Sequence, residues 1–283
     1  MKQPLTVIIP CKDEQENIAD CIASARLVAD EVLIADSGST DQTLELARQS
    51  GPCRVIQREY VNSGDFKNWA IPQATTPWVM ILDADERITE SLAREINQLL
   101  ASEPARDGYW IYRANYFMGR RIRYSGWQND RVLRLFRRDQ GRYHGGTDHA
   151  EVEIQSGRVG RLHHRLQHYT YRSYDEFFSR FQRYTTYQAE KWYREGRRAN
   201  RFKLVLTMPA RFLLAYVVRL GFLDGIAGFQ VCMLTGFYSF MKQARLWELQ
   251  RRGEISGRNG SYSEAAEPKG EVVLTALPHR SAA

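Results

Sequence analysis

Short apolar runs alternate with segments of helical spacing through the first hundred residues of the chain. The runs are rich in β-branched residues, and they predict strands over 5–9, 31–35, 54–57 and 78–82. Apolar residues three and four positions apart predict helices over 17–28, from Thr40 or Asp41 through Ala47, over 67–73, and from Thr89 to Leu100. Such alternation indicates a parallel sheet with helices on both faces, in which a ligand site lies beyond the carboxyl ends of the strands.

The pattern changes in the second part of the chain. It predicts strands over 109–114, 132–136 and 159–168, followed by a helix rich in tyrosine, phenylalanine and arginine over 174–198. The polar, turn-rich residues from Gly253 onward predict a disordered tail.

The most apolar stretch covers residues 203–243 and is interrupted by charges at Lys203, Arg211, Arg219 and Asp224. Its longest uncharged run, 225–241, has 17 residues, which is the lower limit for a helix that spans a bilayer. We therefore expect two amphipathic helices that lie in a membrane interface or pack on an oligomer partner. A buried helical hairpin of a soluble fold is the alternative.

The composition predicts a globular protein with a sizeable core. Of the 283 residues, 43% are hydrophobic, which excludes a disordered chain and a small fold held by disulfides. The four cysteines show no CxxC spacing and no neighbouring histidine cluster, which argues against a disulfide framework or a structural zinc site and favours a reducing compartment. The first apolar run is too short for a secretion signal, so export is not expected.

The formal net charge of +7 is divided unevenly along the chain. Residues 1–102 carry 9 Lys and Arg against 16 Asp and Glu, whereas residues 103–283 carry 31 against 17. An acidic half joined to a basic half argues against one uniform nucleic-acid-binding surface. It predicts one part that handles cations and another that meets phosphates, nucleic acid or a membrane surface.

The strongest candidate chemistry lies in ILDADE, residues 81–86, directly after a predicted strand. Asp83 and Asp85 are two positions apart, so both carboxylates can approach one hard divalent cation, which can then neutralise a diphosphate. A surface turn with solvated acids is the alternative, because aspartate is common in turns. The position at the expected mouth of the sheet favours the metal.

Two further motifs follow the first and second strands. In ADSGSTD, Asp36 stands where a carboxylate can accept hydrogen bonds from a nucleoside, although the residues after it also suit the start of a helix. In IPCKDEQENI, Pro10 ends the strand, and Glu14 or Glu16 can face the cleft or favour a helix N-terminus through its dipole. The chain has neither GxGxxG nor a P-loop sequence, so a Rossmann dinucleotide site and a P-loop are unsupported.

Taken in order, these motifs resemble glycosyltransferase family 2. PCKDEQENI, ADSGSTD, the pair Lys67 and Asn68, and LDADE carry the resemblance in the first half. GWQNDRVLRLFRR, RLHHRLQHYTYRS and the apolar segment 208–248 resemble the bacterial lipopolysaccharide-core β-glucosyltransferase branch, and the likeness extends over 4–250. It implies an α/β GT-A fold, with a Rossmann-like, mostly parallel sheet, helices on both faces and C-terminal apolar helices.

The resemblance implies a nucleoside pocket in the first half. Pro10, Glu14 and Asp36 match positions that line it. Lys67 is also expected at the donor, where the family more often has arginine. A second acid is usual after Asp36 in the family, and Ser37 stands there instead.

The resemblance also implies the reaction centre. Asp83 and Asp85 match the metal and diphosphate motif, with Asp85 expected to ligate Mg²⁺ or Mn²⁺ directly. Asp130 matches the acidic position expected to act as the base, and His168 matches a histidine that approaches the metal or the diphosphate.

The assignment of Asp130 has an alternative, which is an ion pair with Arg131 or Arg134 in a stretch crowded with arginines. The reserve candidates for the base are Glu86, Asp148 and Glu151. The family's His-Glu pair appears in this chain as His149, Ala150 and Glu151, so the correspondence is weaker there.

We therefore expect an inverting, metal-dependent glycosyltransferase of the cell envelope. The expected donor is a nucleotide-sugar, a UDP-hexose such as UDP-glucose, and the acceptor is a hydroxyl of a lipopolysaccharide core or another glycolipid or glycan. The enzyme would be cytoplasmic and peripheral on the inner face of the cytoplasmic membrane, with a homo-oligomer left open and no nucleic acid as partner. The expected domains are 1–170 for catalysis, 171–252 for membrane or oligomer contact, and 253–283 as the tail.

Other functions remain as alternatives at this point. An enzyme of the same family can act on a different polysaccharide or on a protein. A basic nucleic-acid-binding protein would have no need of the strand-end aspartates, and no groove-reading motif is present. A nucleotidyltransferase would need an early phosphate-gripping loop, which the sequence lacks.

Overall fold

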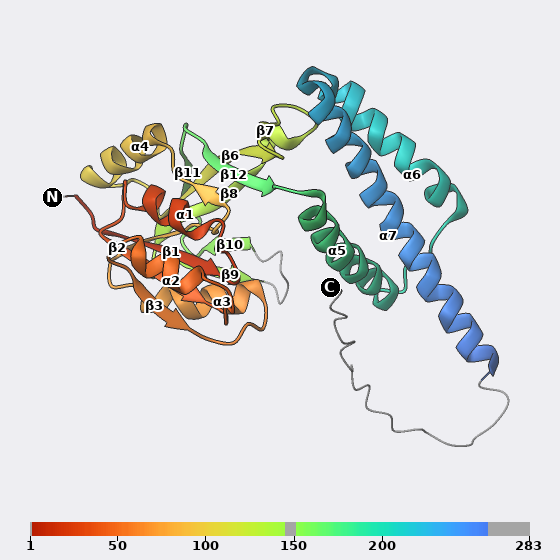
Figure 1. The fold of residues 1–283 in the computed structure, drawn as a ribbon, viewed down its shortest axis with the longest axis horizontal. Coiled ribbons are helices and arrows are strands. Elements are labelled where there is room, and N and C mark those ends of the chain that lie inside the picture. Colours follow the sequence, from red (N-terminus) through yellow and green to blue (C-terminus); the bar gives the residue numbers. More distant parts are fainter. Residues whose placement is uncertain (1, 145–150, 260–283) are drawn as a thin grey trace, which may run out of the picture.

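The structure is a computed structural model that describes residues 2–144 and 151–259. Figure 1 shows a sheet with flanking helices and, beside it, a group of long helices formed by the C-terminal part of the chain. The chain passes from one to the other where strand β12 (Leu166–Tyr171) leads into helix α5 (Tyr174–Arg194). The α/β class expected from the sequence is confirmed.

The first half of the sheet is parallel, as the alternation predicted. Its strands are β1 (Leu5–Cys11), β2 (Glu31–Asp36), β3 (Arg54–Gln57) and β4 (Trp78–Ile81). They lie in the order β3-β2-β1-β4, and their register sets Cys11 beside Asp36. The loops that carry the candidate motifs therefore leave the sheet at one edge.

The sheet continues beyond β4 with antiparallel neighbours. Strand β8 (Arg131–Arg137) pairs with β4 on one side and with β6 (Gly108–Phe117) on the other, and β6 pairs in parallel with β12. This arrangement brings the amino-terminal end of β8 and the carboxyl ends of β6 and β12 to the edge where β4 ends. The shorter strands are β5 (Glu86–Arg87), β7 (Arg120–Arg121), β9 (Gly141–His144), β10 (Glu151–Ile154) and β11 (Val159–Arg161).

The single strand predicted over 159–168 is wrong, because the structure has β11 and β12 there with a break between them. The carboxylate of Glu95 accepts the backbone N–H groups of His163 and His164 at 2.7 and 2.9 Å. These bonds turn the chain between the two strands and take the two histidines out of the sheet.

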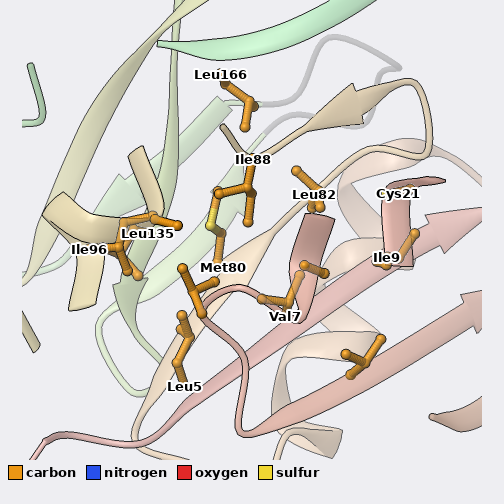
Figure 2. Packing of buried hydrophobic residues seen from close by; sticks show 14 of the residues in the cluster. Leu5, Val7, Ile9, Cys21, Met80, Leu82, Ile88, Ile96, Leu135 and Leu166 are labelled. Carbon is orange, nitrogen blue, oxygen red and sulfur yellow. The ribbon is translucent and has the colours of Figure 1, made fainter. Parts of the chain in front are cut away.

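Alternate side chains of the central strands enter two cores on opposite faces of the sheet. One core contains Leu5, Val7 and Ile9 of β1 and is covered by the helices α1 (Ile18–Ala25), α2 (Thr43–Gln49) and α4 (Glu90–Ala101). Figure 2 shows side chains from β1, β4, α1 and α4 converging there. The other core contains Ile8 and is covered by α3 (Ser63–Ala70) and the turn η1 (Ile71–Gln73). The continuous apolar runs of the sequence are thus strands whose alternate side chains are buried on both faces of the sheet.

The helix starts show how local sequence sets the element bounds. Helix α4 begins after Thr89, whose side chain accepts the N–H of Leu92, as predicted. The helix expected over 67–73 begins earlier, because the side chain of Asn62 caps α3 by accepting the N–H of Asp65. Asn62 was not recognised as a cap in the sequence because no clear apolar period follows it.

The predicted C-terminal helices are present. Helix α6 (Arg201–Leu213) continues as a π-helical turn, η3 (Leu214–Val218), and a second turn, η4 (Gly221–Asp224), leads into α7 (Gly225–Asn259). Figure 1 shows α6 and α7 as a long hairpin, with α5 beside α7. Among the described helices no single one is long and apolar enough to cross a membrane, whereas Arg201–Val218 and Gly221–Gly253, which meet at a bend of 74°, pass that test together by length and composition.

Helix α7 extends past the boundary predicted at residue 252 and ends at Asn259. A single glycine such as Gly253 costs a helix only about 1 kcal/mol, so the packed helix continues through it. The rest of the predicted tail, 260–283, lies outside the described residues.

Candidate active site

A cleft of about 740 Å³ opens at the carboxyl ends of β1, β2 and β4, between the sheet and helix α5. This is the edge at which a parallel sheet is expected to bind its ligand. Predicted site residues that line the cleft are Pro10, Glu14, Lys67, Asp83, Asp85 and His168. Helix α5 contributes Glu176, Arg180 and Arg183 to the opposite wall.

Asp36 lies behind the wall of the cleft and is fully buried. Its carboxylate accepts the N–H groups of Gly38 and Ser39, the Ser39 hydroxyl at 2.5 Å and the Gln57 amide at 2.9 Å. Burial alone would raise the pKa of Asp36, but these hydrogen bonds outweigh it and lower the pKa. Asp36 therefore shapes the loop, in which Gly38 has a φ of 93°, and the neighbouring Ser37 lines the cleft.

Asp83 is half-buried and belongs to a network of opposite charges. Its carboxylate pairs with Arg134 of β8 and, at 3.0 Å, with the Nζ atom of Lys67. Arg134 also holds the fully buried Glu86 at 2.8 Å. Burial would raise the pKa of Asp83, but the charges of Arg134 and Lys67 hold it far below its usual range. Both oxygens of Asp83 thus face cations of the chain itself, as the antiparallel β4–β8 pairing dictates.

Replacing Arg134 with leucine is expected to lower the free energy of unfolding by about 3 kcal/mol, the low end of the cost of breaking a buried ion pair, because the fully buried Glu86 keeps Arg113 at 3.4 Å as its cation while the half-buried Asp83 keeps Lys67. The exposed Arg94→Leu on α4 serves as the control in urea unfolding experiments.

The loss of stability in the Arg134 variant should also depend on pH. The pKa of Asp83 is lowered in the folded protein, so its ion pair contributes stability above the unfolded pKa of about 3.9 and loses that contribution as the pH falls. The difference in the free energy of unfolding between the wild type and the Arg134 variant should therefore begin to decrease below about pH 3.9. A variant as stable as the control at neutral pH would contradict the importance of this network.

Asp85 faces the cleft with a different set of neighbours. Its Oδ2 atom lies 3.6 Å from Nε2 of His168 and 3.4 Å from Nη1 of Arg180. Burial would raise the pKa of Asp85, but the imidazole and, to a lesser extent, the guanidinium outweigh it and lower the pKa. Arg180 is held in turn by Glu176, one helical turn earlier on α5, at 2.7 Å.

Asn115 of β6 fixes the orientation of His168. Its Nδ2 donates to the carboxylate of Asp130 at 2.8 Å, so its Oδ1, 2.7 Å from Nδ1 of His168, accepts a hydrogen bond from the Nδ1–H group of the imidazole. The proton on Nδ1 is thus held by Asn115, and Nε2, the nitrogen that faces Asp85, is the one at which a metal ion could replace a proton. The chain of contacts from Asp130 through Asn115 to His168 therefore presents an imidazole ligand to the cleft.

Asp130 lies at the start of β8, in a second cavity of about 450 Å³. Its carboxylate is gripped by Arg113, with Nε and Nη2 each at 2.9 Å. Burial would raise the pKa of Asp130, but the Arg113 interaction and the Asn115 amide outweigh it and lower the pKa. The second cavity shares Arg113, His168, Thr170 and Tyr171 with the main cleft, so the two hollows meet at His168.

The donor set at Asp85 fits a divalent cation. A carboxylate oxygen suits Mg²⁺ or Mn²⁺, and an imidazole nitrogen whose other N–H is hydrogen-bonded is a common transition-metal ligand, which favours Mn²⁺. Asp83 fits such an ion less well, because its oxygens are already paired with Arg134 and Lys67. Within the described residues no group of three or more His, Cys, Asp or Glu side chains forms a ligand cluster, so water or a bound anion would complete the coordination.

Two of the reserve candidates for the base, Glu86 and Glu151, line neither cavity. Asp148 and His149 lie outside the described residues, and Glu151 is exposed on β10. Glu86 is fully buried and paired with arginines, so it is no free base. The four cysteines are free thiols.

Sequence reasoning missed Arg113, Asn115 and Arg180. The first two lie on β6, opposite β12, and the register sets Asn115 beside His168. Strand pairing of this kind leaves no linear signal. Arg180 had one usable signal, the Glu176–Arg180 spacing of four on a helix, but that spacing is common on solvated helix faces.

The family model and two curated relatives that match this chain are glycosyltransferases. Residues 6–161 match the model of glycosyl transferase family 2. The chain is 30% identical over 252 residues to the lipopolysaccharide core biosynthesis glycosyltransferase LpsC of Rhizobium meliloti, covering 87% of this chain and 93% of that protein. It is 28% identical over 264 residues to the uncharacterized glycosyltransferase RT0209 of Rickettsia typhi, covering 88% of each chain. The crystal structure of residues 1–349 of S. aureus TarS matches 88% of this chain and 92% of its own, at 18% identity and a TM-score of 0.46.

Proposed function

Because the chain belongs to glycosyltransferase family 2, we propose that it transfers a hexose from a nucleoside diphosphate sugar to a hydroxyl of a glycolipid, with a divalent metal held at Asp85. The observation that carries this proposal is the meeting of two cavities at His168, one beside Asp85 and one beside Asp130. A transferase needs such adjacent spaces, because donor and acceptor must reach one reacting carbon.

The main cleft is the proposed donor site. The nucleoside would lie against Pro10, Glu14 and Ser37, at the carboxyl ends of β1 and β2. Burial raises the pKa of Glu14, which suits a side chain that hydrogen-bonds a neutral base or ribose. Arg180 and Arg183 on α5 add positive charge on the opposite wall for the diphosphate.

Asp85 and His168 are the proposed ligands of the metal, which when bound supplies positive charge against the diphosphate leaving group. Arg180 lies 3.4 Å from the Asp85 carboxylate, and its ion pair with Glu176 keeps it on the cleft wall, where its guanidinium group would face the diphosphate. Asp83 keeps Lys67 and Arg134 in place behind the site.

Asp130 is the proposed base in the second cavity. Its two oxygens accept three hydrogen bonds, from Arg113 and Asn115, which leaves a lone pair for the proton of an acceptor hydroxyl. The lowered pKa keeps the carboxylate ionised, and the proton moves to it as the hydroxyl oxygen attacks the anomeric carbon. The carbon–oxygen bond to the diphosphate breaks on the opposite side, so the configuration inverts.

The outer face of α6 is the proposed membrane contact. Its exposed apolar side chains recur at helical spacing and continue onto the turn after the helix, namely Phe202, Val205, Leu206, Leu213, Val217 and Val218. Basic residues flank this stripe at Lys203, Arg211 and Arg219. Apolar area bordered by Lys and Arg suits the surface of an anionic leaflet, which we take to be the inner face of the cytoplasmic membrane. The alternative is that this face packs against a second copy of the chain.

The acceptor and the sugar are proposed from similarity. The relative LpsC is named as a lipopolysaccharide core glycosyltransferase, and its length is nearly covered by this chain, so a lipopolysaccharide-core acceptor is the first choice. UDP-glucose is the proposed donor.

A screen of nucleotide-sugars tests the proposed function. Purified protein is incubated with UDP- and GDP-sugars, and release of the nucleoside diphosphate is measured with Mn²⁺, with Mg²⁺ and with a chelator. We expect metal-dependent turnover of a UDP-hexose that the chelator abolishes. If no nucleotide-sugar is turned over in the presence of either metal, the proposal fails.

A further inference from the structure

A third cavity, of about 620 Å³, lies away from the proposed donor cleft, where the loop after β6 meets the turn between α6 and α7. It is lined on one side by basic residues and on the other by apolar ones. The lining residues are Arg120, Arg121, Arg123, Tyr124, Leu223, Asp224, Ile226 and Ala227.

The loop that carries the arginines is fastened to the helical turn. The carboxylate of Asp224 accepts the backbone N–H groups of Arg123 and Tyr124 at 3.0 and 2.8 Å, and the N–H of Ser125 donates to the carbonyl of Arg219 at 3.0 Å. Gly126, with a φ of 98°, lets the Arg219 side chain pass where a Cβ atom would collide with it. The cavity therefore has fixed walls.

The three guanidinium groups have no counter-charge of their own. Within the described residues, Arg120, Arg121 and Arg123 form no side-chain hydrogen bond or ion pair. Asp224 is the one acid that lines the cavity, and its oxygens are taken by backbone N–H groups. Three like charges gathered on one wall without a partner are typical of a site that receives an anion.

The opposite wall indicates what kind of anion enters. Leu223 and Ile226 line the cavity and are 53% and 75% exposed, so they extend the apolar stripe of α6 around the end of the hairpin. A free phosphate gains no binding free energy from an apolar wall. An amphiphile gains it from both walls, because its phosphate can contact the arginines and its apolar part is removed from water. Continuity with the stripe places the cavity at the level where lipid headgroups would lie.

The same loop connects this cavity with the proposed acceptor cavity. It runs from Arg120 through Gly126 and Trp127 to Asp130, and these last residues line the hollow beside the proposed base. An amphiphile held at the arginines would thus be anchored on the same side of the molecule as the acceptor.

We propose that this cavity binds the phosphate of an anionic membrane lipid, with the three arginines around the phosphate and Leu223 and Ile226 beside the apolar part of the lipid. The inference rests on the membrane placement given under the proposed function and assigns it a specific site.

Vesicle flotation of the full chain tests the proposal. Arg120, Arg121 and Arg123 are replaced together by glutamine, and the control replaces three exposed arginines of the sheet domain, Arg48, Arg94 and Arg106, in the same way, so that net charge is matched. On vesicles of phosphatidylcholine with phosphatidylglycerol we expect about a hundredfold weaker binding for the cavity variant, from a roughly fivefold loss per arginine at an anionic surface. The control should bind like the wild type, and equal melting curves by circular dichroism show that each variant is folded.

A second variant distinguishes the contribution of the apolar wall to vesicle binding from that of the basic wall. Leu223→Ser with Ile226→Ser should weaken binding to neutral phosphatidylcholine vesicles as well, whereas the arginine variant should change binding to anionic vesicles alone. Equal losses for the cavity and control arginine variants would overturn the proposal, because they would show a diffuse charge effect.

Other occupants give different results. If inorganic phosphate, at a concentration equal to that of the anionic lipid, releases the protein from the vesicles, the cavity binds a soluble anion and the proposal is wrong. If the wild type binds no vesicle but forms a dimer that the arginine variant disrupts in sedimentation equilibrium, the cover is a second copy. Neither result depends on donor turnover, which tests the proposed function separately on the wild-type protein.

Discussion

Replacing Asp85 with asparagine should lower metal-dependent turnover of the nucleotide-sugar by about three orders of magnitude. The carboxylate faces the cleft beside Nε2 of His168 at 3.6 Å, and it is the proposed anionic ligand of the metal. An amide of the same shape removes the charge and leaves the packing intact. The fold should survive, because Arg180 keeps its ion pair with Glu176.

The measurement pairs turnover with metal affinity. Release of nucleoside diphosphate gives the rate, and the electron paramagnetic resonance signal of free Mn²⁺ gives the binding constant. Asp139→Asn, at an exposed site in the turn after β8, is the matched control and should retain both. If the Asp85 variant binds Mn²⁺ and turns over donor like this control, Asp85 does not hold the metal.

Replacing Asp130 with asparagine should lower the rate of sugar transfer by about 10²- to 10⁴-fold, the range for loss of a general base. The amide keeps the shape of the side chain and its oxygen can still accept a hydrogen bond from Arg113, whereas the ion pair with Arg113 is lost. Binding of the donor should stay as in the wild type, because Asp130 lines the second cavity and not the main cleft.

The alternative is that Asp130 serves only to stabilise the fold through its ion pair with Arg113. In that case its variant would lose stability in urea unfolding while the transfer rate of the folded fraction remained unchanged. The pH profile gives a further distinction. A base with a lowered pKa keeps the wild-type rate down to acidic pH, and loss of rate begins only below the ordinary aspartate pKa of about 3.9.

The outline of the site could be predicted from the sequence because it depends on strand ends. An apolar run followed by Asp83 and Asp85 places both acids at the edge of the sheet, whatever the order of the strands. The same holds for Pro10 and Glu14 after β1. The structure lines the cleft with these residues.

The partners of these residues could not be predicted, since they depend on which strands are neighbours. Arg134 reaches Asp83 because β8 runs antiparallel to β4. Asp130 was expected to pair, if at all, with the adjacent Arg131 or Arg134, yet it pairs with Arg113, which is distant in sequence. Adjacent residues on a strand point to opposite faces, so sequence proximity is a poor guide to such contacts.

The division of charge along the chain acquires a physical meaning from the structure. Three acidic residues of the first half, Asp83, Asp85 and Glu86, lie together at the sheet edge, where chain cations and the proposed metal neutralise them. Several arginines of the second half serve these same carboxylates, among them Arg113, Arg134 and Arg180. Others, at Arg120, Arg121 and Arg123, remain without acidic partners in the described part of the chain and form the proposed lipid site.

The central claim is that Asp85 and His168 hold a divalent metal between donor and acceptor. Anomalous diffraction from crystals grown with Mn²⁺ and UDP tests it most directly. The account predicts one manganese peak bonded to a carboxylate oxygen of Asp85, to Nε2 of His168 and to the diphosphate, with Arg180 moved off Asp85 toward the phosphates. A manganese ion bound elsewhere, or UDP bound in the cleft with Arg180 still on Asp85 and no metal, would contradict it.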